Sequence, residues 1–80
     1  MIEDIIESYP EEEFLIADGY DEAIIGFDEI SMRLIYSMSK CIDILMEDMS
    51  GEDAMEHFSF NVVNAYVGDK TPIWCNDFML

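Results

Sequence analysis

Apolar residues recur at three- and four-residue spacing between Ser50 and Gly68, and this pattern predicts the longest helix of the chain. Ser50 is placed as the N-cap, and Asp53 follows where a carboxylate can accept from free amides of the first turn. Gly68 is placed to end the helix in a left-handed conformation, and Pro72 prevents a restart. The residues expected to face the core are Ala54, Met55, Phe58, Val62, Ala65 and Tyr66.

Two shorter segments also have helical spacing. Residues 2–9 place apolar side chains on one side of an amphipathic helix that Pro10 ends. Another helix is predicted to start at Ser37 or Ser39, because either serine can be the N-cap, and to run to about Met49. Its expected core-facing residues are Cys41, Ile42, Leu45, Met46 and Met49. Since the helix from Ser50 follows almost at once, the two are expected to form a helical hairpin.

Three apolar runs predict β-strands. Residues 23–27 (AIIGF) and 33–36 (RLIY) are separated by a short polar stretch, which is typical of a hairpin. Gly26 within the first strand indicates a bulge or the close approach of a neighbouring element. Residues 71–75 (TPIWC) predict a last strand, and Pro72 places it at a sheet edge or at a strand end.

This order of elements predicts an α+β fold. A small sheet of two to three strands, antiparallel or mixed, would pack against the helical hairpin, with the short helix preceding them. Residues 1–80 are expected to form a single domain. Its stability margin should be thin, because a chain of this size buries only about 60 to 65% of its unfolded surface.

The charge of the chain is far from balanced. Nineteen acidic residues accompany three basic ones, for a formal net charge of −16, and 51% of the residues are hydrophobic. The apolar content excludes a disordered acidic chain. Solubility requires a net charge of only about 2 to 8, so the excess favours a role in which the protein meets a basic surface. The same sign disfavours nucleic acid and anionic membranes as direct partners.

The acidic residues occur in groups, and the predicted partner-binding residues are Glu11, Glu12, Glu13, Asp18, Asp21, Glu22, Asp28, Glu29, Asp43, Glu47 and Asp48. DNA carries one charge per about 3.4 Å of each strand, so a rigid protein with spaced carboxylates can occupy a surface built for phosphates. Phe27, Met32 or Trp74 would add an apolar contact. The simpler interpretation is a solvated surface on which Glu52 and Asp53 face the helix dipole.

No catalytic residue is predicted. His57, Asn61 and Asn64 form a polar stripe at i, i+4 and i+7. A catalytic interpretation would make His57 a general base oriented by Asn61, but no nucleophile accompanies it. We therefore expect the two amides to bond backbone groups and His57 to be partly exposed.

No metal or cofactor is predicted either. Cys41 and Cys75 lack the paired spacing of a zinc site, and no DxDxDG loop indicates calcium. Two cysteines in a chain of this length are typical of free thiols in a reducing cytoplasm. No apolar run reaches the roughly 18 residues of a membrane span, and no basic n-region precedes one, so neither an anchor nor an export signal is expected.

Three segments carry a resemblance to a known family. They are Ala17–Gly26, Lys40–Leu45 and Glu52–Ile73, the last reading EDAMEHFSFNVVNAYVGDKTPI. Together they resemble a family of small tailed-bacteriophage proteins of unknown function, with the patterns ADGxDEAxIG, KCIxIL and EDAxExFxFNVxxAYVGxxTPxF. The resemblance implies a phage origin and action in the host cytoplasm, and it implies no reaction.

Two non-enzymatic functions fit these observations. In the first, the protein is a phage-encoded acidic inhibitor, a DNA mimic or anti-defence factor that binds a basic host protein such as a nuclease or another DNA-binding defence factor. In the second, it is a phage structural or accessory protein, homodimeric, whose charge is incidental. An enzyme would require that His57 or Asn61 be essential for activity and dispensable for folding.

Overall fold

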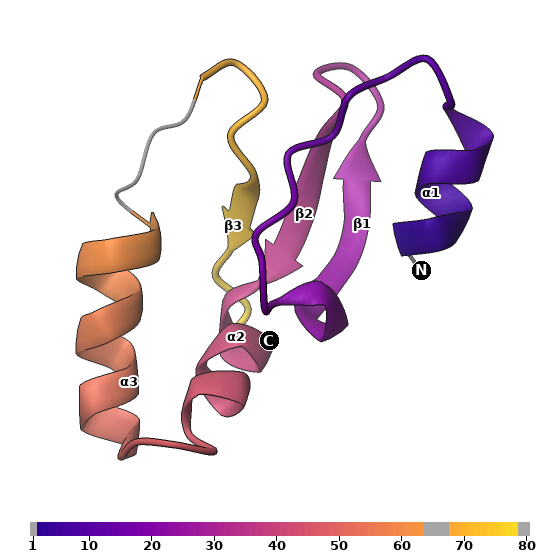
Figure 1. The fold of residues 1–80 in the computed structure, drawn as a ribbon. Helices are drawn as coiled ribbons and strands as arrows, with labels where there is room; N and C mark the ends of the chain where they lie inside the picture. The colour runs from indigo at the N-terminus through magenta and orange to yellow at the C-terminus, as the bar shows by residue number, and fades with distance from the viewer. Residues whose placement is uncertain (1, 64–67, 79–80) are drawn as a thin grey trace.

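The computed structural model describes residues 2–63 and 68–78, and within them it confirms the α+β fold (Figure 1). The chain forms α1 (Ile2–Ser8), the 3₁₀ turn η1 (Asp21–Ala23), β1 (Ile24–Asp28), β2 (Arg33–Ser37), α2 (Met38–Leu45), α3 (Gly51–Phe58), the π-helical segment η2 (Ser59–Val63) and β3 (Ile73–Cys75). Among the described residues no helix has the length and apolar character required to cross a membrane.

The described strands form a three-stranded mixed sheet in the order β1-β2-β3. β1 and β2 form the predicted antiparallel hairpin, with Phe27 opposite Leu34. The register shifts between Ile24 and Gly26, which confirms the predicted bulge. β3 runs parallel to β2 with Ile73 opposite Ile35, so it is an edge strand, as Pro72 predicted.

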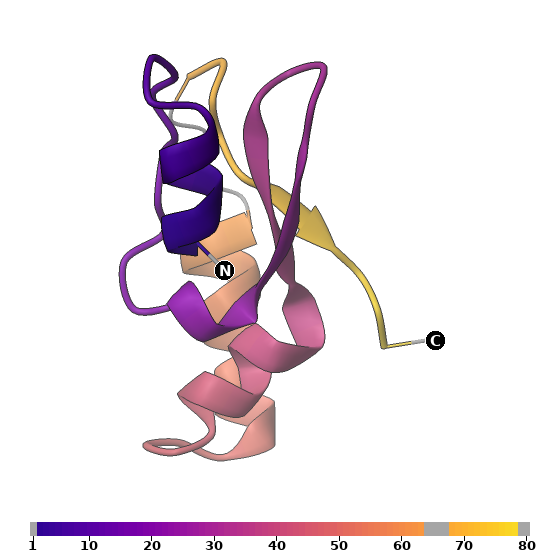
Figure 2. The same cartoon turned by 90° about the vertical axis from the view of Figure 1, so that its right-hand side faces the viewer.

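The core lies on one face of this sheet. Leu34 and Tyr36 of β2 are fully buried there, and Trp74 of β3 stacks beside Tyr36 with ring centroids 5.0 Å apart. Phe58 of α3 meets Trp74 edge-on at 5.4 Å, and Tyr9, directly after α1, meets Phe27 of β1 at 5.2 Å. Figure 2 shows α1 and α3 on the same side of the sheet. Aromatic edge contacts thus connect the helical layer to the strands.

Residues 9–20 form no helix or strand and lie over the core, against which Phe14, Ala17 and Tyr20 pack. Their position is fixed at Ala17, whose backbone N–H donates to the Tyr36 hydroxyl at 2.8 Å. Gly19 then adopts φ 91°, a left-handed conformation that favours glycine, and the Tyr20 amide bonds the Ala17 carbonyl at 3.2 Å. A turn at Asp18 and Gly19 therefore leads into η1.

α2 is shorter than predicted. It starts after the N-cap Ser37, whose side chain accepts from the Lys40 amide, but it ends at Leu45 and not at Met49. The next residues form a tighter turn, in which the Glu47 amide bonds the carbonyl of Ile44 three residues earlier. Met46 is consequently 48% exposed, so its predicted place in the core is wrong.

α3 begins as predicted, with Ser50 as the N-cap and its side chain accepting from the Asp53 amide at 3.2 Å. Its α-helical part ends at Phe58, and the chain continues as the π-helix η2. The wider π turn breaks the regular spacing on which the long core face was predicted. Ala54 and Phe58 are buried, whereas Met55 is 46% exposed and its predicted burial is wrong.

The end of the predicted long helix is described in part. Val62 packs against the core, and Gly68 has φ 112°, which confirms its left-handed conformation. Ala65, Tyr66 and Asn64 lie outside the described residues.

Asp77, which the sequence analysis did not identify, joins the chain after β3 to the start of α2. Its carboxylate accepts from the fully buried Ser37 hydroxyl and, at 3.0 Å, from the Ser39 amide. These hydrogen bonds, with that from Ser37 the largest influence, lower the pKa of Asp77 to about 2. Ser37 also caps α2, so one hydroxyl serves both contacts.

We predict that Asp77→Asn destabilises the fold at neutral pH. The folded pKa of about 2 lies below the ordinary 3.8, so the ionised carboxylate stabilises the fold above that ordinary value and loses this effect as the pH falls toward 2. Urea unfolding at a series of pH values should show a stability difference from wild type that shrinks between about pH 4 and pH 2. Ser37→Ala, which also removes the cap, should cost at least about 1 kcal/mol.

The control is Asp48→Asn, which removes the same charge from an exposed position. If Asp77→Asn and Asp48→Asn had equal stability across this pH range, the role of Asp77 would be refuted.

Candidate acidic interface

Ten of the eleven predicted partner-binding residues separate into two groups, and Asp48 belongs to neither. The first group surrounds a surface hollow between η1 and α2, here called the acidic hollow. Its carboxylates belong to Asp18, Asp21, Glu22, Asp43 and Glu47. Ile44 and Lys40 line it as well. Residues separated by about 20 positions in the sequence therefore meet at one place.

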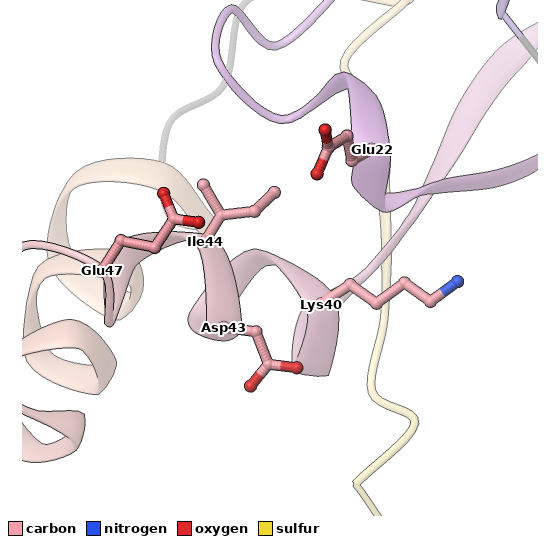
Figure 3. A pocket seen from close by; sticks show the side chains of 5 residues that line it. All are labelled: Glu22, Lys40, Asp43, Ile44 and Glu47. Carbon is pink, nitrogen blue, oxygen red and sulfur yellow. The ribbon is translucent and has the colours of Figure 1, made fainter.

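Two carboxylates of the acidic hollow lie on either side of an apolar side chain. Figure 3 shows Glu22, from η1, and Glu47, from the turn after α2, flanking Ile44. Asp43 extends along the outer side of α2, and the ammonium group of Lys40 points away from both glutamates. The middle of the hollow thus combines a half-buried aliphatic surface with negative charge on both sides.

Local structure explains this arrangement. Residues 40, 43, 44 and 47 recur at three- and four-residue spacing, which puts them on one side of α2 and its following turn. Ala23 is fully buried, and its amide bonds the Tyr20 carbonyl at 2.9 Å, which fixes η1 against the core. With η1 fixed, Asp21 and Glu22 are held at the surface opposite α2.

The second group lies at the end of the molecule that carries the β1-β2 turn (Figure 1). It comprises Glu11, Glu12, Glu13, Asp28 and Glu29. The Lys70 ammonium lies 3.4 Å from a Glu12 carboxylate oxygen and donates to the Ser31 carbonyl at 3.1 Å. Glu12 is therefore partly neutralised within the fold.

Asp28 has a structural role in the β1-β2 turn. Its carboxylate accepts from the Ser31 hydroxyl at 2.7 Å and from the Ile30 amide at 3.3 Å. These bonds, that of the Ser31 side chain foremost, lower the pKa of Asp28. Asp48, by contrast, is exposed in the turn after α2 and does not line the acidic hollow.

The aromatic residues predicted to assist binding lie elsewhere. Phe27 packs against Tyr9, and Trp74 packs against Tyr36 and Phe58. The apolar residue in the acidic hollow is Ile44, which the sequence analysis did not single out. Its position beside Asp43 and three residues before Glu47 was the available signal.

The remaining candidates for chemistry do not line the acidic hollow. The ring of His57 lies 3.3 Å from the Asn61 amide nitrogen, and both side chains are exposed. Cys41 is buried, and desolvation raises the pKa of its thiol to about 12, which keeps it protonated. Cys41 and Cys75 are free thiols. In the part of the chain that the structure describes, no three His, Cys, Asp or Glu side chains are grouped to hold a metal ion.

Comparison with protein-family models, with curated proteins and with solved structures gives no match in any of the three. The assignment of this surface therefore rests on the geometry and charge described above, and the resemblance to phage proteins stays a prediction.

We predict that Glu22→Gln/Glu47→Gln raises the melting temperature at low ionic strength, because the two carboxylates share one hollow with three further acidic residues. The matched control is Glu7→Gln/Glu56→Gln, which removes the same charge from two separate exposed positions outside both acidic groups. Thermal unfolding at about 0.02 M salt should separate the two variants, and the difference should vanish near 1 M, where the screening length is about 3 Å. Equal effects of both variants at low salt would contradict the prediction.

Proposed function

We propose that this protein is a phage-encoded inhibitor that binds a basic, DNA-binding host protein through the acidic hollow. The observation that carries the proposal is the placement of Glu22 and Glu47 on either side of Ile44. A solvated acidic surface requires no apolar centre. Binding of a lysine or arginine side chain uses such a centre, because the aliphatic stem packs on apolar surface while the charged head meets carboxylates.

The charge of the whole molecule supports the same partner. Of its three basic residues, Lys70 and Arg33 bond backbone carbonyls within the fold, those of Ser31 and Thr71. The formal net charge of −16 attracts a basic protein from a distance and accelerates the encounter. It also opposes association of two copies, which disfavours the homodimeric accessory function.

The two acidic groups fit a mimic of DNA. The acidic hollow lies between η1 and α2, and the second acidic group lies at the end of the molecule that carries the β1-β2 turn (Figure 1). Carboxylates held at two separate places on a folded protein can meet a basic surface that contacts phosphates at two places. The protein would thus occupy the DNA-binding surface of a nuclease or other defence factor. Action in the host cytoplasm follows from the proposed phage origin.

We expect the immobilised protein to capture basic DNA-binding proteins from a bacterial lysate. Duplex DNA should release them, as should raising the salt from about 0.05 to 0.5 M, because charge dominates such contacts. Glu22→Gln/Glu47→Gln should recover at least about tenfold less than wild type. Glu3→Gln/Glu7→Gln, with the same loss of charge on α1, should recover the wild-type amount.

Capture that neither salt nor DNA reverses would refute the proposal. Equal recovery by the two double variants would exclude the acidic hollow as the binding surface. Light scattering of the free protein tests the accessory function, because that function predicts a dimer. A monomer at all salt concentrations would contradict it.

A further inference from the structure

An apolar groove is lined by Leu15, Ile16, Ala17, Asn61, Val62, Pro72 and Trp74 and has a volume of about 280 Å³. Ala17 lines the groove and the next residue, Asp18, lines the acidic hollow, so negative charge lies one residue from the apolar lining. Exposure of Leu15 (39%) and Ile16 (46%) leaves this apolar surface open to water.

Trp74 lines the groove and has a buried polar atom. Its indole ring is held between Tyr36 at 5.0 Å and Phe58 at 5.4 Å, which fixes its position. The indole Nε1 is buried, and among the described residues it has no hydrogen-bond acceptor. With its ring fixed between two aromatic residues, Trp74 forms a rigid apolar wall of the groove.

We propose that the groove binds a segment of the basic partner in which an apolar side chain is flanked by lysine or arginine. The apolar side chain covers Ile16 and Val62, and the flanking cations meet the carboxylates of the acidic hollow beyond Asp18. This inference rests on the proposed function and identifies the apolar part of the same interface. Such buried apolar anchors surrounded by charge provide most of the affinity of many interfaces.

Charge selects this occupant over others. A second copy would bring a further net charge of −16 against Asp18 and its neighbours, and an anionic membrane is repelled in the same way. A volume of about 280 Å³ accommodates one or two side chains of a polypeptide.

Trp74 is the only tryptophan of the chain, so its fluorescence reports on the groove directly. The probe is a synthetic peptide of alternating leucine and lysine, about 12 residues long, enough for the extended segment that such recognition uses. We expect it to bind and to change the Trp74 emission. A peptide with serine in place of every leucine should bind at least about tenfold more weakly and leave the emission unchanged.

Ile16→Ser should weaken binding of the leucine-lysine peptide by about tenfold, as expected for loss of a central apolar contact. The matched control is Ile6→Ser on α1, because Ile6 is 42% exposed and Ile16 is 46% exposed. Both changes affect exposed side chains, and circular dichroism verifies that each variant is folded. The control variant should bind as wild type does.

The outcomes separate this inference from the proposed function. Binding that depends on Glu22 and Glu47 but not on Ile16, with unchanged Trp74 emission, would overturn the groove and leave the proposed function intact. Equal affinity of the serine and leucine peptides would also overturn it. If Ile16-dependent binding is found but no basic protein is captured from lysate, the groove stands and the proposed inhibitor function is refuted.

Discussion

The hydrogen bond from the Ala17 amide to the Tyr36 hydroxyl determines how the surface of this molecule is organised. Tyr36 is fully buried in the central strand, where desolvation, the main influence, raises the pKa of its hydroxyl and keeps it protonated. By holding Ala17 against the sheet, the bond fixes a segment that has no regular secondary structure. Ala17 lines the apolar groove and Asp18, the next residue, lines the acidic hollow, so both surfaces depend on the position of this segment.

The small core of this highly charged fold is supplemented by polar contacts that connect segments distant in the sequence. Lys70 connects the segment after α1 to the β1-β2 turn through Glu12 and Ser31. Asp77 connects the chain after β3 to the first turn of α2, where the free amides and the positive end of the helix favour a carboxylate. Each of these polar contacts joins segments that would otherwise be held only by the packing of a limited apolar surface.

The features that the sequence predicted well are those fixed by local backbone chemistry. Ser50 and Ser37 cap their helices, Gly68 is left-handed, and the bulge lies at Gly26 because these outcomes depend on a few neighbouring residues. The π-helix after Phe58 was not predicted, since apolar spacing alone does not distinguish it from an α-helix. Asp77 was missed because its partners lie 38 and 40 residues earlier in the chain.

The sequence predicted which acidic residues take part in the candidate site but not how they are arranged in space. The acidic groups at residues 18–22 and 43–47 were recognised separately, but their union around Ile44 depends on the packing of η1 beside α2. Asp28 also shows why a list of carboxylates overstates a binding surface. Its position before a hairpin turn gives it a local role, bonded to Ser31 and Ile30, that composition does not reveal.

The parallel pairing of β3 with β2 has a consequence for synthesis on the ribosome. Ile73 pairs with Ile35, 38 residues earlier, and until β3 is made the sheet is a lone hairpin, an arrangement of marginal stability in water. Trp74 arrives with β3, so the aromatic contacts with Tyr36 and Phe58 also form late. During translation the nascent chain therefore carries its charge without a finished interior, and the mutual repulsion of its carboxylates keeps such incomplete chains apart from one another.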